Sequence, residues 1–164
     1  MEQITLFTSA QLLEHWQEHR RLTRKTIIAF PETAFFEHSI GGMRPFAQLV
    51  SEMLDLAEYG IEGIVTGTWK PIYQLPHHGN NKLPLDTKEE FLQKWDEVTV
   101  LINDFWHKIT AERFQTVEKA FGAFEATNFD SIMYFIDNEI HHRGQGTVYL
   151  RSLGIEPPAF YDRS

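Results

Sequence analysis

Several side chains that bind metals or transfer protons interrupt an apolar helical pattern near the C-terminus. Residues 137–145 read DNEIHHRGQ. On a helix, Asn138, His142 and Gln145 fall along one line, and Glu139 and His142 fall along the neighbouring line. Burying such groups without partners costs about 1–3 kcal/mol each. A metal ion, another side chain or a ligand must therefore satisfy them.

The element that positions these groups is a long helix over residues 130–158 with a well-defined end. Its apolar residues recur at helical spacing, namely Ile132, Phe135, Ile136, Ile140, Tyr149, Leu150 and Leu153. Thr127 and Asp130 form a plausible capping box at its start. Gly154 suits the position after the last helical turn, and Pro157-Pro158 prevents continuation.

Three further segments show helical periodicity, at residues 9–30, 44–66 and 87–110. Residues 111–126 leave two alternatives open, a short hairpin near 114–126 or a bent extension of the preceding helix. Four helices of about 22–24 residues, each with one apolar stripe, predict an all-α four-helix bundle. We expect a single domain over residues 1–164.

A long loop over residues 67–86 contains three prolines and two glycines and shows no periodicity. Loops of this length in compact domains are often functional lids or only partly ordered. His77 and His78 within it resemble a metal-binding pair, but adjacent residues rarely reach one ion, so we favour a solvent-exposed pair. His15 and His19 have metal-ligand spacing, but their charged neighbours favour a solvated helix face.

Composition excludes several classes of function. The formal net charge is −8, and the chain contains no cysteine. An acidic chain is a poor partner for nucleic acid or an anionic membrane, and without cysteine it has neither disulfides nor a thiolate of its own. We find no signal peptide and no transmembrane segment in the sequence, and we expect a cytoplasmic protein.

The string HHRGQ at residues 141–145, followed by YLRSLGIEPP, resembles the last helix of the DinB/YfiT-like superfamily, and Arg44-Pro45-Phe46 resembles the family's entry to its second helix. The resemblance implies an up-up-down-down four-helix bundle, a homodimer, and a divalent metal such as nickel or zinc held by three histidines. Some relatives are metal-dependent thiol S-transferases that use small thiols such as bacillithiol, and another branch includes a mycothiol-dependent maleylpyruvate isomerase.

Carried over residue by residue, the resemblance places the metal ligands at Glu52, Asn138 and His142, where only the last is a histidine. A carboxylate, an amide and an imidazole form a harder ligand set than three imidazoles, which favours manganese, iron(II) or magnesium over nickel or zinc. The side chains expected to support this site are Glu139, His141, Arg143 and Gln145. Arg143 is expected to pair with Glu139 or with a carboxylate on a neighbouring helix.

Two functions follow from these observations. The first is a metal-dependent enzyme, such as a thiol transferase, in which the metal binds a small-molecule thiol cosubstrate and presents its thiolate as nucleophile. The alternative is a non-catalytic, stress-associated binding or dimerisation module. In that case the polar residues form a buried hydrogen-bonded network that fixes the register of the helices. We favour the first because bundles commonly build metal sites from facing helices.

Overall fold

The computed structural model describes residues 6–78 and 83–164, so residues 79–82 of the predicted loop lie outside the described residues. Four long helices form the bundle: α1 Ser9–Ala29, α3 Phe46–Thr66, α4 Lys88–Trp106 and α6 Asn128–Ser152. Shorter elements connect them: α2 Glu32–Glu37, η1 Ile72–Gln74, η2 Pro76–His78, α5 Ala111–Gln115, β1 Val117–Ala120 and β2 Phe124–Thr127. The predicted all-α four-helix bundle is confirmed.

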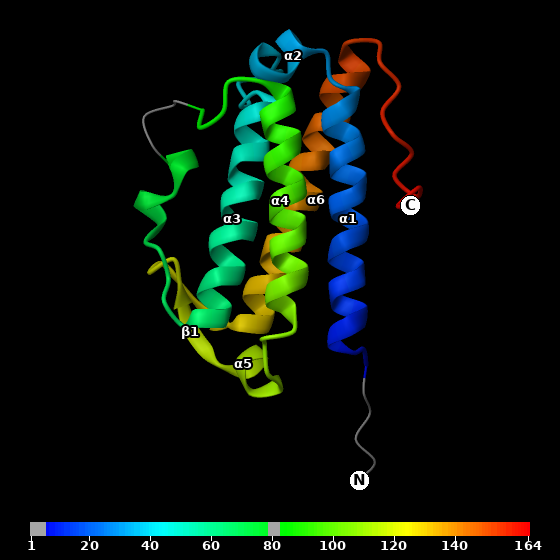
Figure 1. The fold of residues 1–164 in the computed structure, drawn as a ribbon. Coiled ribbons are helices and arrows are strands. Elements are labelled where there is room, and N and C mark those ends of the chain that lie inside the picture. Colours follow the sequence, from blue (N-terminus) through cyan, green and yellow to red (C-terminus); the bar gives the residue numbers. More distant parts are fainter. Residues whose placement is uncertain (1–5, 79–82) are drawn as a thin grey trace.

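The helix directions differ from the predicted up-up-down-down order. Figure 1 shows α1 and α6 running one way and α3 and α4 running the other, which gives an up-down-down-up order along the chain. The long connection after α3 therefore joins two parallel helices. In the bundle, α3 packs against α4 and α6, and α1 packs against the same two helices. The helices that supply the predicted site, α3 and α6, are thus direct neighbours.

Local sequence signals fix the ends of the long helices. Thr87 caps α4 through a capping box with Glu90, and the side chain of Thr127 accepts a hydrogen bond from the backbone N–H of Asp130 at the start of α6. Gly154 follows α6 with a φ of 74°, a left-handed conformation that glycine adopts without steric cost. These signals at the helix ends therefore fix where the polar residues 137–145 of α6 lie along the axis of the bundle.

Aromatic side chains fill the core between the helices. The largest fully buried ones are Trp16, Trp95, Tyr149, Phe30, Phe35, Phe46, Phe91 and Phe121. The ring of Phe46 stacks on that of Phe30, with 4.7 Å between the centroids, and it also lies against Gly146 of α6. A Cβ atom at Gly146 would overlap the Phe46 ring, which explains why this helix position carries a glycine.

The segment between α4 and α6 contains the hairpin that was one of the two alternatives. β1 and β2 pair antiparallel, with Val117 opposite Thr127 and Ala120 opposite Phe124. The turn places Phe121 and Gly122 at positive φ, 53° and 69°. Phe121 is nevertheless buried, because this turn directs its ring into the molecule beside α6.

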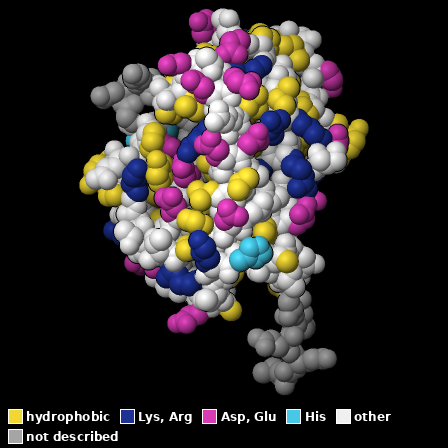
Figure 2. Space-filling view, viewed as in Figure 1, with side chains coloured by type: hydrophobic (Ala, Val, Ile, Leu, Met, Phe, Trp, Pro, Cys, Tyr) yellow, Lys and Arg dark blue, Asp and Glu magenta, His cyan; other side chains and the backbone are white. Residues whose placement is uncertain are grey.

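The face seen in Figure 2 is of mixed charge, with acidic and basic side chains both present and hydrophobic side chains between them. In the described ranges, no helix is long and apolar enough to cross a membrane.

Candidate functional site

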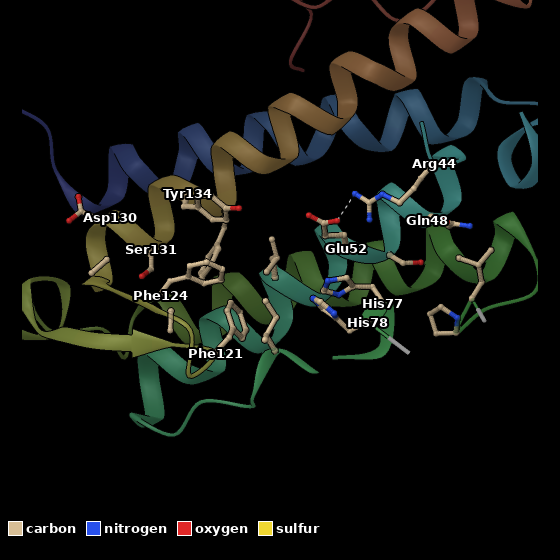
Figure 3. Close-up of a pocket in the computed structure, with 18 residues that line it drawn as sticks. Arg44, Gln48, Glu52, His77, His78, Phe121, Phe124, Asp130, Ser131 and Tyr134 are labelled. Atoms are coloured by element: carbon tan, nitrogen blue, oxygen red, sulfur yellow. Dashed lines mark ion pairs between the residues drawn. The ribbon is translucent and has the colours of Figure 1, made fainter. Parts of the chain in front are cut away.

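A cavity of about 570 Å³ lies beside α3 and α6 and is also lined by residues of the hairpin and of the η1 and η2 turns. Its polar lining residues include Arg44, Gln48, Glu52, His77 and His78. Its aromatic lining residues are Phe121, Phe124, Tyr134 and Phe135. Figure 3 shows the labelled aromatic rings grouped at one end and Arg44, Gln48 and Glu52 toward the other. The volume is typical of a small-molecule site.

The structure brings the three predicted ligands, Glu52, Asn138 and His142, into contact. The Nδ2 atom of Asn138 donates to Oε1 of Glu52 at 2.9 Å, and Nε2 of His142 lies 3.1 Å from the same oxygen. Behind the imidazole, Nδ1 of His142 lies 2.7 Å from Oε1 of Gln145. Direct hydrogen bonds between α3 and α6 thus join residues that are 86 and 90 positions apart in the sequence.

Arg44 supplies the positive charge beside Glu52. Its guanidinium lies 2.7 Å from Oε2 of the carboxylate, so both carboxylate oxygens are engaged. Burial alone would raise the pKa of Glu52, but hydrogen bonds from His142, Asn138 and Arg44 outweigh burial and hold it well below its usual range. The carboxylate is therefore ionised, and side chains of the protein stabilise its charge.

These contacts do not fit a metal ion. A carboxylate can only accept hydrogen bonds, so Nε2 of His142 carries a proton toward Glu52 and has no lone pair for a metal. Asn138 presents its amide nitrogen, while its Oδ1 atom is buried without a hydrogen-bond partner among the described residues. A neutral amide oxygen alone is a poor ligand. Among residues 6–78 and 83–164, no group of three His, Asp or Glu residues is placed to hold a metal.

Two of the supporting residues, Glu139 and Arg143, lie on the side of α6 that faces α1. Thr23 links them, because its hydroxyl donates to Glu139 at 2.6 Å and accepts from Arg143 at 3.1 Å. Arg143 therefore does not pair directly with Glu139 as predicted, and the nearest cation to that carboxylate is Arg20, at 3.7 Å. Burial raises the pKa of Glu139, while Arg20, Thr23 and Arg143 oppose that shift.

The structure corrects two interpretations of histidines. His19 was assigned to a solvated face, but it is buried and its Nδ1 lies 3.0 Å from the guanidinium of Arg143. Burial, and then the charge of Arg143, lower the pKa of His19 to about 3, so the ring is neutral. By contrast, His141, expected to support the site, is exposed, and its ring contacts that of His142.

The second correction concerns His77, which was expected to be solvent-exposed with His78. Its side chain is only 9% exposed, and its Nδ1 lies 2.7 Å from Oδ2 of Asp55, a buried carboxylate on α3. Sequence reasoning missed Asp55, although a charged residue between Leu54 and Leu56 of an apolar helix was a usable signal. Arg44 could likewise have been found, since it precedes Glu52 by eight residues, about two helical turns.

Comparison with known proteins supports the fold. A DinB-like protein from Bacillus subtilis is 18% identical and superposes with a TM-score of 0.68 over 92% of this chain and 97% of its own. A DinB-like protein from Bacillus cereus ATCC 10987 is 17% identical, with a TM-score of 0.68 over 93% and 97%. A search of the curated proteins finds no match. The family model described as "DinB family" matches residues 1–164, so the chain belongs to the DinB family.

Proposed function

We propose that this chain is a metal-independent binding protein that takes a small organic molecule with an aromatic body into the cavity beside α3 and α6. The observation that supports this most is the cavity itself, of about 570 Å³, with aromatic residues at one end and the Arg44–Glu52 ion pair toward the other. Pockets that are mostly apolar and contain a few fixed polar groups are typical ligand sites.

The polar end is organised without a metal. Arg44, Asn138 and His142 together satisfy the charge of Glu52, so the carboxylate is fixed in position by side chains from both helices. A fixed ion pair at a cavity wall can orient the polar group of a ligand, since the guanidinium of Arg44 has further N–H donors. We therefore favour the second of the two predicted functions, a binding module, and add a ligand site to it.

The alternative, metal-dependent thiol transfer, requires ligand atoms that this cluster does not offer. Glu52 has both oxygens engaged, and the contact from His142 uses the nitrogen that would coordinate an ion. The predicted homodimer and cytoplasmic location stay predictions, and analytical ultracentrifugation tests the first of them.

Binding of 1-anilinonaphthalene-8-sulfonate tests the proposal, because this probe combines aromatic rings with an anionic group and its fluorescence rises in apolar sites. We expect saturable binding to the wild-type protein. Ala126→Trp should weaken it about tenfold, since Ala126 lines the cavity and a large side chain there occupies the ligand volume.

The matched control is Glu125→Trp, on the opposite face of the same strand, where the side chain is exposed. This variant should bind the probe like the wild type. Near-ultraviolet circular dichroism must show native packing in all three proteins, because loosely packed states also bind this probe. Equal binding by both variants would overturn the proposed site.

A further inference from the structure

The buried pair formed by Asp55 and His77 leaves one imidazole nitrogen available for proton transfer. Oδ2 of Asp55 accepts hydrogen bonds from both the backbone N–H and the Nδ1 atom of His77, each at 2.7 Å. Because a carboxylate has no proton to donate, the neutral ring must carry its proton on Nδ1 and its lone pair on Nε2. The two bonds also hold the ring in one orientation.

This lone pair belongs to a residue of the cavity wall. His77 lines the cavity, and among the described residues its Nε2 atom has no hydrogen-bond partner. Figure 3 shows His77 on the same side of the cavity as Glu52, with Phe121 and Phe124 toward the other end. A ligand whose aromatic part lies against these rings can direct a polar group toward the imidazole.

The other charged and titratable groups of this wall are Arg44, Glu52, His78, Asp130 and Tyr134, and among the described residues no hydrogen bond or ion pair joins any of them to His77. Arg44 is paired with Glu52. His78 packs against His77, with 4.7 Å between the ring centroids. Asp130 lies near the aromatic end, where it accepts a hydrogen bond from Thr127. Asp55 is therefore the group that stabilises a positive charge on His77, as a carboxylate does for a histidine that acts as a base.

We propose that His77 accepts the proton of an aromatic hydroxyl, so that the cavity selects phenolic ligands. In this step the O–H bond of the phenol breaks, a bond forms between that proton and Nε2 of His77, and the electron pair stays on the phenolate oxygen. The imidazolium next to Asp55 and the phenolate remain together in the cavity, and no co-reactant is needed. This inference rests on the proposed function, because it assigns a ligand class to the same cavity.

The probe that tests it is 4-nitrophenol, whose phenolate absorbs visible light where the neutral form does not. At a pH below the pKa of the probe in water, we expect wild-type protein to produce phenolate absorbance that saturates with protein concentration. His77→Asn should reduce the ratio of bound phenolate to bound phenol about tenfold or more. His107→Asn, the matched control at an exposed histidine that does not line the cavity, should leave that ratio unchanged.

The Asp55→Asn variant distinguishes the effect of Asp55 on proton transfer from its effect on the orientation of the His77 ring. An amide oxygen can still accept the hydrogen bond of Nδ1, so the ring stays oriented, but it no longer stabilises the imidazolium. In equilibrium dialysis this variant should still bind 4-nitrophenol. Less of the bound probe should be phenolate than with the wild-type protein. Full phenolate absorbance in His77→Asn overturns the inference. Failure of wild-type protein to bind 4-nitrophenol in dialysis, while it still binds anilinonaphthalene sulfonate, rejects the phenolic class and leaves the proposed function standing.

Discussion

The imidazole of His142 contacts the carboxylate of Glu52 directly, with 3.1 Å between Nε2 and Oε1. The two side chains that were predicted to hold a metal between them thus meet, but a hydrogen bond occupies the space where an ion would lie. Arg44, 2.7 Å from the other carboxylate oxygen, supplies the balancing positive charge.

Divalent metals should not stabilise the wild-type protein. After treatment with a chelator, adding Mn²⁺, Ni²⁺, Zn²⁺ or Fe²⁺ should leave the melting temperature of untagged protein unchanged, because no ligand atom of Glu52 or His142 is free. The double variant Arg44→Met/Asn138→His removes the competing cation and adds an imidazole one turn before His142. It should gain about 2.7 kcal/mol at a metal concentration of 100 times the dissociation constant.

Arg44→Met alone is the control for this metal experiment, since it opens the carboxylate without adding a third ligand. Stabilisation of wild-type protein as large as that of the double variant would restore the metal-dependent function. Differential scanning fluorimetry with each ion measures all three proteins.

Glu52→Gln should destabilise the protein by about 1–3 kcal/mol at pH 7, because the amide cannot satisfy Arg44 and His142 as a carboxylate does. The pKa of Glu52 is lowered in the folded state from its ordinary value of 4.5. Its contribution to stability is therefore fully present above pH 4.5 and is lost as the pH falls toward the folded-state pKa. Urea unfolding across this pH range should show the two proteins converging.

Glu125→Gln, at an exposed carboxylate of the hairpin, serves as the control and should change stability by less than about 0.5 kcal/mol at any pH. A constant difference between wild type and Glu52→Gln down to acidic pH would contradict the assignment of Glu52 as a low-pKa group.

Thr23→Val should cost about 1.5–3 kcal/mol, because it removes the hydroxyl that donates to Glu139 and accepts from Arg143. Thr26→Val is the matched control on the same helix. Thr26 is equally buried, but within the described part of the chain its hydroxyl bonds only to the carbonyl of Leu22, four residues earlier. Chemical denaturation should give a much smaller loss for Thr26→Val. Equal losses would mean that the link between α1 and α6 contributes little to stability.

Two glycines of α6 should respond oppositely to alanine. Gly144→Ala should stabilise the protein by up to about 1 kcal/mol, because the site is exposed, the new Cβ meets no atom of the described residues within 4 Å beyond its own stretch of helix, and alanine favours the helix. Gly146→Ala should destabilise it by about 1–3 kcal/mol, since the methyl group overlaps the buried Phe46 ring. Thermal unfolding measures both variants. A stabilising Gly146→Ala would show that the ring moves aside at little cost.

Much of the fold could be predicted from local patterns. The capping signal at Thr127, the left-handed Gly154 and the apolar stripes gave helix positions close to those observed. Such features depend on neighbours within one or two turns, so sequence spacing contains the necessary information. The directions of the helices differ from the predicted up-up-down-down order. Which connection joins two parallel helices depends on how the helices pack together, and local patterns do not contain that information.

The candidate site was only partly predictable. Periodicity indicated that at least two polar groups, His142 among them, face the bundle interior, and the resemblance added Asn138 and Glu52. The Arg44 ion pair and the Asp55–His77 pair were not anticipated. His77 stands in a segment without periodicity, and its contact with α3 spans 22 residues through a turn that sequence patterns do not describe.

The sequence by itself therefore determined that polar groups interrupt the core, because helical spacing decides which residues share a face. Only the tertiary structure decided how those groups are satisfied. The contact of Glu52 with His142, the linking position of Thr23 and the orientation of His77 depend on the rotation and approach of neighbouring helices and turns. Those relationships follow from the packing of the whole core, which no local pattern contains.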